Sequence, residues 1–372
     1  MNKISILILL GCLAISQIQA NATPAFSTTK ILPSRENLYA QANENERETQ
    51  KELEKLNIAI KKNPNDIDAY YMRAGHYVHI NQFNKALSDY NYVIKLEPNN
   101  PVHYEYRGQL YANELKEYDK ALADYNQALK LTTDPLSRKI LFEHRGDIYS
   151  DSLKQYDKAI ADYNQAINPC TDCGELYLKR SSTYNKLKQY NKAIADYNKL
   201  LKLNDPHVSK SLIYLNRGNA YYELHNYEQA ISDYNQSIED YGTYKAQALL
   251  QRGKVHNHLG EYNKAIIDFN QAIEDLTSSG YTDVIKESIY YNRGLVYRSL
   301  GSYPKAISDY NQAIKIKPNY ADAYSGLGVV YLDLKQNEKA LMNLKKAREL
   351  YFKQGSKKKA QDLQILINKL SS

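Results

Sequence analysis

Hydrophobic and polar residues follow a helical pattern over most of the chain. In the first clear segment, Tyr70 and Tyr77 share one helical face, residues 81–82 are polar, and Ala86 and Tyr90 begin a second face. Apolar positions three and four residues apart are typical of amphipathic helices, and a short polar break indicates a turn. The pattern therefore predicts two antiparallel helices in this segment.

This two-helix pattern occurs eight times between about residues 67 and 350. The first helices share an arginine, which a leucine replaces in the last copy: Arg73, Arg107, Arg145, Arg180, Arg217, Arg252, Arg293 and Leu327. Successive members are 34, 38, 35, 37, 35, 41 and 34 residues apart. In seven copies the second helix carries Asp, then Tyr or Phe, then Asn. Because one helical hairpin cannot bury both of its apolar faces, neighbouring copies are expected to stack.

The repeated unit resembles the tetratricopeptide repeat (TPR) family. The first copy meets motif positions 4, 7, 8, 11, 20, 24, 27 and 32 with Tyr70, Arg73, Ala74, Tyr77, Ala86, Tyr90, Val93 and Pro98. The resemblance covers about residues 67–350 and implies an all-α solenoid, a right-handed superhelix of about eight helix-turn-helix units. Several middle copies depart from the motif by an extra turn residue or a longer loop between units.

The two ends of the array predict capping elements. Residues 36–66 form an N-terminal capping helix or half repeat, because they match only the second half of a unit. Residues 351–372 contain one more amphipathic helix, Lys357 to Leu370. Terminal caps cover the apolar faces that a stacked array leaves open. We therefore expect one solenoid with eight units at 67–350.

The recurring arginine and aspartate predict an ion pair within each unit. Seven copies carry both residues, such as Arg73 with Asp89, and the eighth copy has lost both, as Leu327 and Asn343. The arginine stem would pack beneath neighbouring tyrosines while its charged head meets the carboxylate. The alternative is a row of arginines that binds phosphates or carboxylates of a ligand.

The resemblance also implies a concave groove, lined by the first helices, that binds a protein or peptide partner. The groove positions carry Tyr71, Glu105, Gln109, Glu143, Asp147 and Asp151 in the N-terminal half, Ser182, Asn185, Asn219 and Tyr222 in the middle, and Lys254, Asn257, Tyr291, Leu295 and Arg298 in the C-terminal half. We expect the groove to be acidic early, polar in the middle and weakly basic late, which would orient a charged ligand. The alternative is a solvated face without a single partner.

The N-terminus predicts export. Residues 1–22 read as a signal peptide, in which Lys3 precedes an uncharged run and Ala20 and Ala22 are small residues where cleavage could fall. Residues 23–35 have no pattern and are expected to form a flexible lead-in. Cleavage would place the protein in the periplasm or outside the cell.

A second reading of the leader gives a membrane anchor. Residues 9–12, Leu-Leu-Gly-Cys, resemble a bacterial lipobox, whose cysteine becomes lipidated after cleavage. In that case the signal ends before Cys12 and the mature protein is a lipoprotein. Lipidation at Cys12 is the only route to a membrane that the sequence offers.

Composition and charge add few constraints. The 372 residues carry 49 Lys and Arg against 42 Asp and Glu, and this balance gives no reason to expect a nucleic-acid partner. Tyr outnumbers Phe by 36 to 5, which is what copying one tyrosine-rich motif produces. The mean hydropathy of −0.65 is too polar for a multispanning membrane protein.

No motif for catalysis, metal binding or cofactor binding is present. The histidines at 76 and 79 lack the Glu of a zinc-protease helix, and there is no Gly-rich phosphate loop or GxSxG elbow. Cys170 and Cys173 predict a local disulfide in an exported protein, with free thiols or a metal site as alternatives. The sequence thus favours an exported, non-catalytic scaffold without cofactors. Its alternatives are a membrane-tethered assembly factor of the bacterial envelope and, third, an enzyme acting on envelope polymers.

Overall fold

A computed structural model describes residues 35–168, 173–240, 243–278 and 285–371. Within these ranges the chain forms eighteen α-helices, two short π-helices and no strand, so the predicted all-α repeat solenoid is confirmed. No helix in these ranges has both the length and the apolar character needed to cross a membrane. The predicted signal peptide (1–22), Cys12, residues 23–34 of the lead-in and Cys170 lie outside the described residues.

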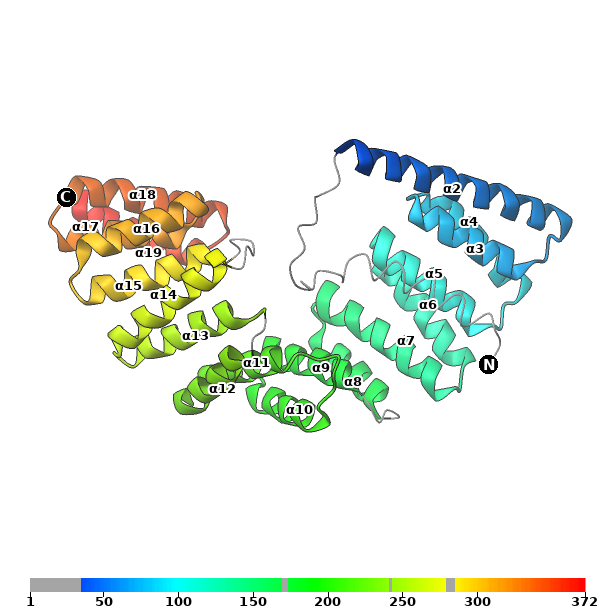
Figure 1. The fold of residues 1–372 in the computed structure, drawn as a ribbon, viewed down its shortest axis with the longest axis horizontal. Coiled ribbons are helices and arrows are strands. Elements are labelled where there is room, and N and C mark those ends of the chain that lie inside the picture. Colours follow the sequence, from blue (N-terminus) through cyan, green and yellow to red (C-terminus); the bar gives the residue numbers. More distant parts are fainter. Residues whose placement is uncertain (1–34, 169–172, 241–242, 279–284, 372) are drawn as a thin grey trace. The chain divides into compact units, whose positions relative to one another are not determined.

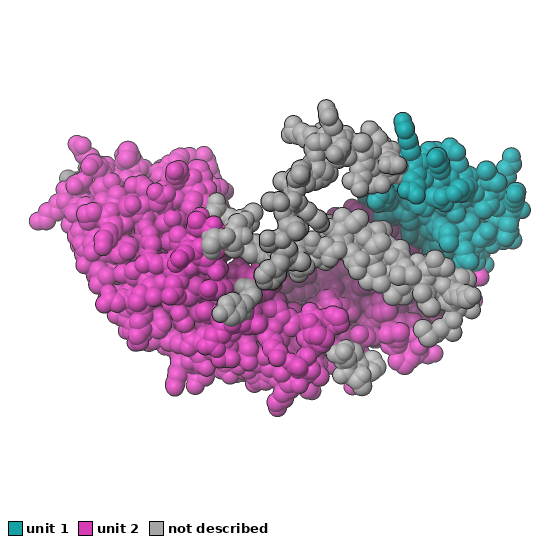
Figure 2. Space-filling view, in the orientation of Figure 1, with its two compact units in different colours: residues 1–96 teal, residues 97–372 magenta. Residues whose placement is uncertain are grey.

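The chain divides into two compact units, residues 1–96 and 97–372 (Figure 2). The first unit contains α2 (Arg35–Lys62), α3 (Ile67–His79) and α4 (Phe83–Leu96). Asp66 caps the N-terminus of α3, because its carboxylate accepts a hydrogen bond from the backbone N–H of Ala69 at 3.1 Å. α2 packs against α3, and α3 against α4.

The second unit contains seven helix pairs and a final helix, which follow one another in chain order (Figure 1). The pairs are α5 (Pro101–Leu110) with α6 (Tyr118–Leu131), α7 (Pro135–Asp147) with α8 (Tyr156–Ile167), α9 (Gly174–Lys186) with α10 (Tyr190–Leu203), α11 (Lys210–Glu223) with α12 (Tyr227–Glu239), α13 (Lys245–His258) with α14 (Tyr262–Ser278), α15 (Lys286–Ser299) with α16 (Tyr303–Ile316), and α17 (Ala321–Asp333) with α18 (Asn337–Lys353). Helix α19 (Lys357–Ser371) packs on α18. We call the leading helix of each pair the first helix and the other the second helix.

The extra turn residue of two copies forms a π-helical turn at the end of the first helix. These turns are η1 (Tyr111–Leu115) after α5 and η2 (Ile148–Ser152) after α7. In these copies the paired Arg and Asp are 17 residues apart, against 16 in the other five. A single widened turn absorbs one inserted residue without shifting the faces of the helices on either side.

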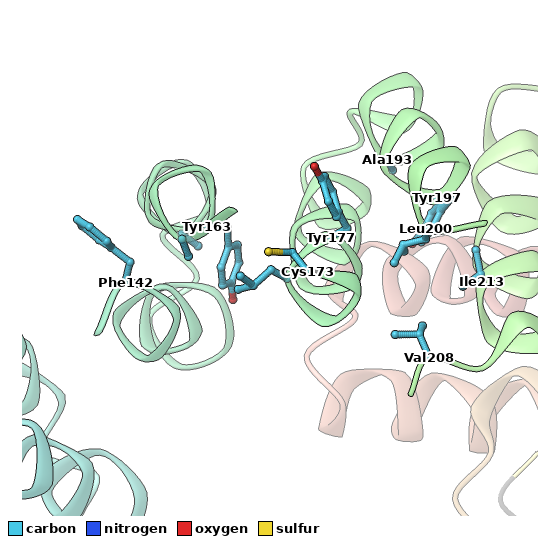
Figure 3. Close-up of a cluster of buried hydrophobic side chains, with 12 residues drawn as sticks. Phe142, Tyr163, Cys173, Tyr177, Ala193, Tyr197, Leu200, Val208 and Ile213 are labelled. Atoms are coloured by element: carbon cyan, nitrogen blue, oxygen red, sulfur yellow. The ribbon is translucent and has the colours of Figure 1, made fainter. Parts of the chain in front are cut away.

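The core repeats along the array with a large ring against a small residue. The aromatic residue of the Asp–Tyr–Asn triplet is almost fully buried in the second unit, as for Tyr163 and Tyr197 in the cluster that extends from α7 to α11 (Figure 3). Its partner is the small residue after the arginine. A Cβ atom added to Gly146 would lie 2.8 Å from Cε1 of Tyr163, so glycine here lets the two helices approach closely.

Candidate functional site

The predicted arginine–aspartate ion pair is present in all seven units that carry both residues. The guanidinium contacts the carboxylate through two parallel bonds, Nε to Oδ2 at 2.7–3.0 Å and Nη2 to Oδ1 at 2.6–2.7 Å. The carboxylates are buried. In the first repeat, α3 with α4, the guanidinium of Arg73 also lies over the rings of Tyr70 and Tyr77. These arginines are therefore occupied within the fold, and the alternative of a ligand-reading row is wrong.

The same arginines connect neighbouring units, which the sequence analysis missed. In six cases Nη1 donates to the side-chain oxygen of an asparagine in the preceding helix pair or, for Arg73, in α2, at 2.5–2.8 Å. For Arg217 the acceptor is Asn198, the last residue of the Asp–Tyr–Asn triplet in the preceding helix pair. Each residue of the triplet thus has its own contact: an ion pair within the unit, a ring in the core, and a bond to the next unit.

The predicted groove residues of the second unit lie on successive first helices. Glu105 and Gln109 are on α5, Glu143 and Asp147 on α7, Asp151 on η2, Ser182 and Asn185 on α9, Asn219 and Tyr222 on α11, Lys254 and Asn257 on α13, and Tyr291, Leu295 and Arg298 on α15. First helices also touch one another directly, α11 with α13, α13 with α15, and α15 with α17. We call this set of side chains the first-helix row. Tyr71 belongs to the separate unit 1–96, where its ring lies 5.9 Å from that of Tyr90.

Buried tyrosines of the second helices form hydrogen bonds with three members of the first-helix row. The hydroxyl of Tyr163 donates to Asp147 at 2.8 Å, and that of Tyr234 donates to Asn219 at 2.9 Å. Asn185 donates to the hydroxyl of Tyr197 at 2.9 Å. These bonds restrict the rotamers of the row, so its polar groups are positioned before any partner arrives.

Ion pairs between neighbouring first helices neutralise the predicted acidic part of the row. Lys179 on α9 donates to Glu143 at 2.6 Å and to Asp147 at 2.8 Å, and Lys186 donates to Asp151 at 2.8 Å. Burial alone would lower the pKa of Lys179, but the two carboxylates raise it above its ordinary value. These carboxylates therefore hold α7 and η2 against α9.

The late part of the row is also paired. Arg298 on α15 donates to Asp333 at the end of α17, with 2.7 Å between Nε and Oδ2. Asp322 on α17 accepts bonds from Tyr351 at 2.6 Å and from Lys359 of α19 at 2.9 Å. The predicted gradient from acidic to basic charge is corrected accordingly, because most of its charges are compensated by neighbouring helices.

Two charged members of the row have no ion pair within the described residues. Glu105 accepts one bond, from Gln109 at 3.2 Å, and burial raises the pKa of its carboxyl to about 7. Lys254 donates one bond, to Gln251 at 3.2 Å, and burial lowers the pKa of its ammonium group. Both shifts have the same cause, since a group taken out of water without a counter-charge favours its neutral form.

The remaining members of the row are polar or aromatic except for Leu295, which is partly buried and packs against the core. Tyr222 lies 5.8 Å from Tyr227, and Tyr291 lies 5.9 Å from Tyr310, measured between ring centroids. Burial raises the pKa of Tyr291 to about 12. Ser182 is exposed and Asn257 is half-buried.

The described residues also include a disulfide-bonded cysteine and a pocket outside the first-helix row. Among the described residues, no group of three or more His, Cys, Asp or Glu could hold a metal ion. Cys173 is buried and disulfide-bonded, but its predicted partner Cys170 lies outside the described residues, so the pairing stays a prediction. A pocket near the C-terminus includes none of the first-helix row; it is lined by Tyr324, Met342, Arg348, Glu349, Gln364 and Ile367 among others.

Comparison with known proteins identifies the family. Models of the tetratricopeptide repeat match residues 71–136, 141–168, 172–242, 215–280 and 321–354, and a model of the TPR repeat matches 294–335. No curated protein sequence matches significantly. A tetratricopeptide repeat protein from Parabacteroides merdae has a similar structure, with a TM-score of 0.56, 22% identity, and coverage of 72% of this chain and 98% of that one. The C-terminal part of a TPR repeat-containing protein from Cytophaga hutchinsonii has a TM-score of 0.55 at 20% identity, covering 69% and 99%. The chain therefore belongs to the tetratricopeptide repeat family.

Proposed function

We propose that this chain is a non-catalytic scaffold that binds another protein, or a peptide segment of one, along the first-helix row. The observation that carries the proposal is the fixed arrangement of polar side chains along successive first helices. Core tyrosines hold Asp147, Asn185 and Asn219 in place, and ion pairs hold the helices that carry them. A surface whose rotamers are set in advance loses less conformational entropy when a partner binds.

Site-specific photocrosslinking in cells tests this proposal. A photoreactive amino acid at Ser182, which is exposed on α9, is expected to crosslink to a partner protein. The matched control is Lys202, which is exposed on the second helix α10. The absence of crosslinks at Ser182, or equal crosslinks at both positions, would contradict the proposed surface.

We also propose that the protein is exported through its N-terminal leader. The support is the sequence alone: a positive residue, an uncharged run, and small residues at Ala20 and Ala22. The intact mass of the mature protein distinguishes the two readings. Cleavage near Ala20 or Ala22 gives an unmodified chain, whereas a lipoprotein begins at Cys12 and carries added acyl mass.

The second candidate function is a membrane-tethered assembly factor of the bacterial envelope. The lipobox-like residues before Cys12 favour it. Partition of the wild-type protein into detergent, and its loss in a Cys12→Ala variant, would support this function. An unmodified mature chain without Cys12 would exclude it.

A further inference from the structure

The charges of the first-helix row differ in what they can offer a partner. Glu143, Asp147, Asp151 and Arg298 already have oppositely charged partners at 2.6–2.8 Å on neighbouring helices. A ligand would have to compete with these pairs to use them. Glu105 and Lys254 have no ion pair within the described residues, so only these two row charges remain available without such competition.

Glu105 offers a site for a cation. Its carboxylate lies half-buried on α5 and accepts one bond, from the uncharged amide of Gln109. The nearby carboxylates are engaged elsewhere, Asp124 by Arg107 and Asp147 by Lys179. A basic side chain placed here would form a charge-assisted hydrogen bond in partly desolvated surroundings, where such bonds are strong.

Lys254 offers the complementary site for an anion. It lies half-buried on α13, at the position where α7 carries Asp147 and α11 carries Asn219. Its ammonium group has three donors, and one of them bonds to the amide oxygen of Gln251. A carboxylate placed here would satisfy the remaining donors and compensate the charge.

The surface between these two sites is suited to a peptide backbone. The row members Ser182, Asn185, Asn219 and Tyr222 on α9 and α11 are uncharged. Ser182 is exposed, and Asn185, Asn219 and Tyr222 are half-buried. An extended peptide carries N–H and C=O groups along its length, to which uncharged polar side chains at a surface can form hydrogen bonds.

The spacing also suits a short extended segment. Glu105 and Lys254 are four first helices apart, and packed helices lie about 8–10 Å from axis to axis, so four steps cover at least roughly 30–40 Å. An extended chain advances about 3.3 Å per residue, so at least about 10–12 residues are needed to span the two sites.

We propose that the first-helix row binds an extended peptide in one direction, with a basic side chain at Glu105 and an acidic group at Lys254. This proposal rests on the proposed function. The peptide direction is set because the two available charges have opposite signs and stand at different ends of the segment. A reversed peptide would place like charges together at both ends, which costs binding free energy.

A random dodecapeptide library displayed on phage tests the proposal on the full mature chain at pH 8, where the Glu105 carboxyl is ionised. Wild-type protein is expected to select peptides with a basic residue near one end and an acidic residue near the other. The Lys254→Glu variant should select a basic residue in place of the acidic one. Lys192→Glu, the same charge change at an exposed position of α10, should leave the selection unchanged.

Fluorescence anisotropy with one selected peptide then measures each end. Lys254→Gln and Glu105→Gln are each expected to weaken binding about 10-fold or more, and the same peptide in reversed order should bind at least about 10-fold more weakly. Circular dichroism checks that each variant is folded. Selected peptides without a charge preference, or an unchanged preference in Lys254→Glu, would overturn this inference alone. Failure to select any peptide would overturn the proposed function with it.

Discussion

The seventh repeat unit (α15 with α16) and the eighth (α17 with α18) pack their helix pairs in the same way, but with different residues at the contact. In the seventh unit, Arg293 and Asp309 form a two-bond ion pair, and the ring of Tyr310 fills the space beside Gly294. In the eighth unit, Leu327 and Asn343 replace the pair, and both are about as buried as Asp309. Asn343 donates to the backbone oxygen of Lys339 in its own helix instead.

Both units keep the contact between a small residue and a large one. A Cβ on Gly294 would lie 2.8 Å from Tyr310, and a Cβ on Gly328 would lie 2.6 Å from Leu344. The helix pair therefore depends on this close contact, and the uncharged residues Leu327 and Asn343 can replace the ion pair. What the eighth unit loses is the link to its predecessor, because Arg293 reaches Asn270 of the sixth unit whereas Leu327 has no such donor.

The largest expected effect comes from breaking the ion pair on one side. Asp309→Ala leaves the guanidinium of Arg293 half-buried without its carboxylate, so we expect a loss of about 3 kcal/mol in the opening free energy of α15 and α16. Hydrogen exchange of the amides in these helices measures it. Asn343→Ala is the control in the eighth unit and should cost about 1 kcal/mol or less. Equal losses in the two variants would contradict the view that the ion pair distinguishes the seventh repeat from the eighth.

A double variant makes the seventh unit resemble the eighth. Arg293→Leu combined with Asp309→Asn removes both charges together, so no buried charge remains unpaired. We expect a loss of about 1–2 kcal/mol, smaller than that of Asp309→Ala alone. Urea unfolding followed by circular dichroism provides the measurement. If the double variant is as unstable as the sum of its single variants, Arg293 and Asp309 have no coupling free energy, and the ion pair does not explain the loss in Asp309→Ala.

Glu105 sharpens the comparison because it is a half-buried carboxylate without an ion pair. Its pKa is about 7 in the folded protein, against about 4.3 in an unfolded chain, so folding disfavours the ionised form. Stability is therefore lost as the pH rises from about 4 through 7. Glu105→Gln should be more stable than wild type by about 1–2 kcal/mol at pH 8, after allowance for partial exposure, and equal to it near pH 4. A difference that is the same at both pH values would contradict this explanation.

The smallest effect concerns the link between units. Asn270→Ala removes the oxygen that accepts from Nη1 of Arg293, and we expect a loss of about 1 kcal/mol at the junction of α14 and α15. Asn311→Ala is the matched control, because the following unit has Leu327 in place of the arginine. Its opening free energy should change by less than about 0.5 kcal/mol. Hydrogen exchange at the two junctions compares them directly.

The sequence allowed much of the fold to be predicted. The copied spacing of Tyr70, Arg73 and Ala74 identified the helix pairs, and the joint loss at Leu327 and Asn343 indicated the ion pair. The bond from each arginine to the preceding asparagine was not predicted, although the asparagine recurs visibly in the triplet. It joins residues of different units, and a motif read unit by unit does not show which neighbour its members meet.

The candidate site was less accessible to sequence reasoning. The groove positions implied by the resemblance place the row on the first helices, but its charges depend on neighbours distant in the chain. Lys179 follows Glu143 by 36 residues and is not itself a groove position, so its two ion pairs could not be read from the motif. Whether Glu105 and Lys254 meet an oppositely charged side chain depends on what packs around them, and only the packed array shows this.

The repeated bond between an arginine and the asparagine of the preceding unit has a consequence for how such a protein can change in length. Every linked junction offers the same acceptor on one side and the same donor on the other, as at Asn198 with Arg217 and at Asn235 with Arg252. Removal of one whole hairpin would bring together two surfaces that already match. The array can thus gain or lose a repeat by recombination without further changes at the contacts between repeats. A different number of repeats would present a binding surface of a different length.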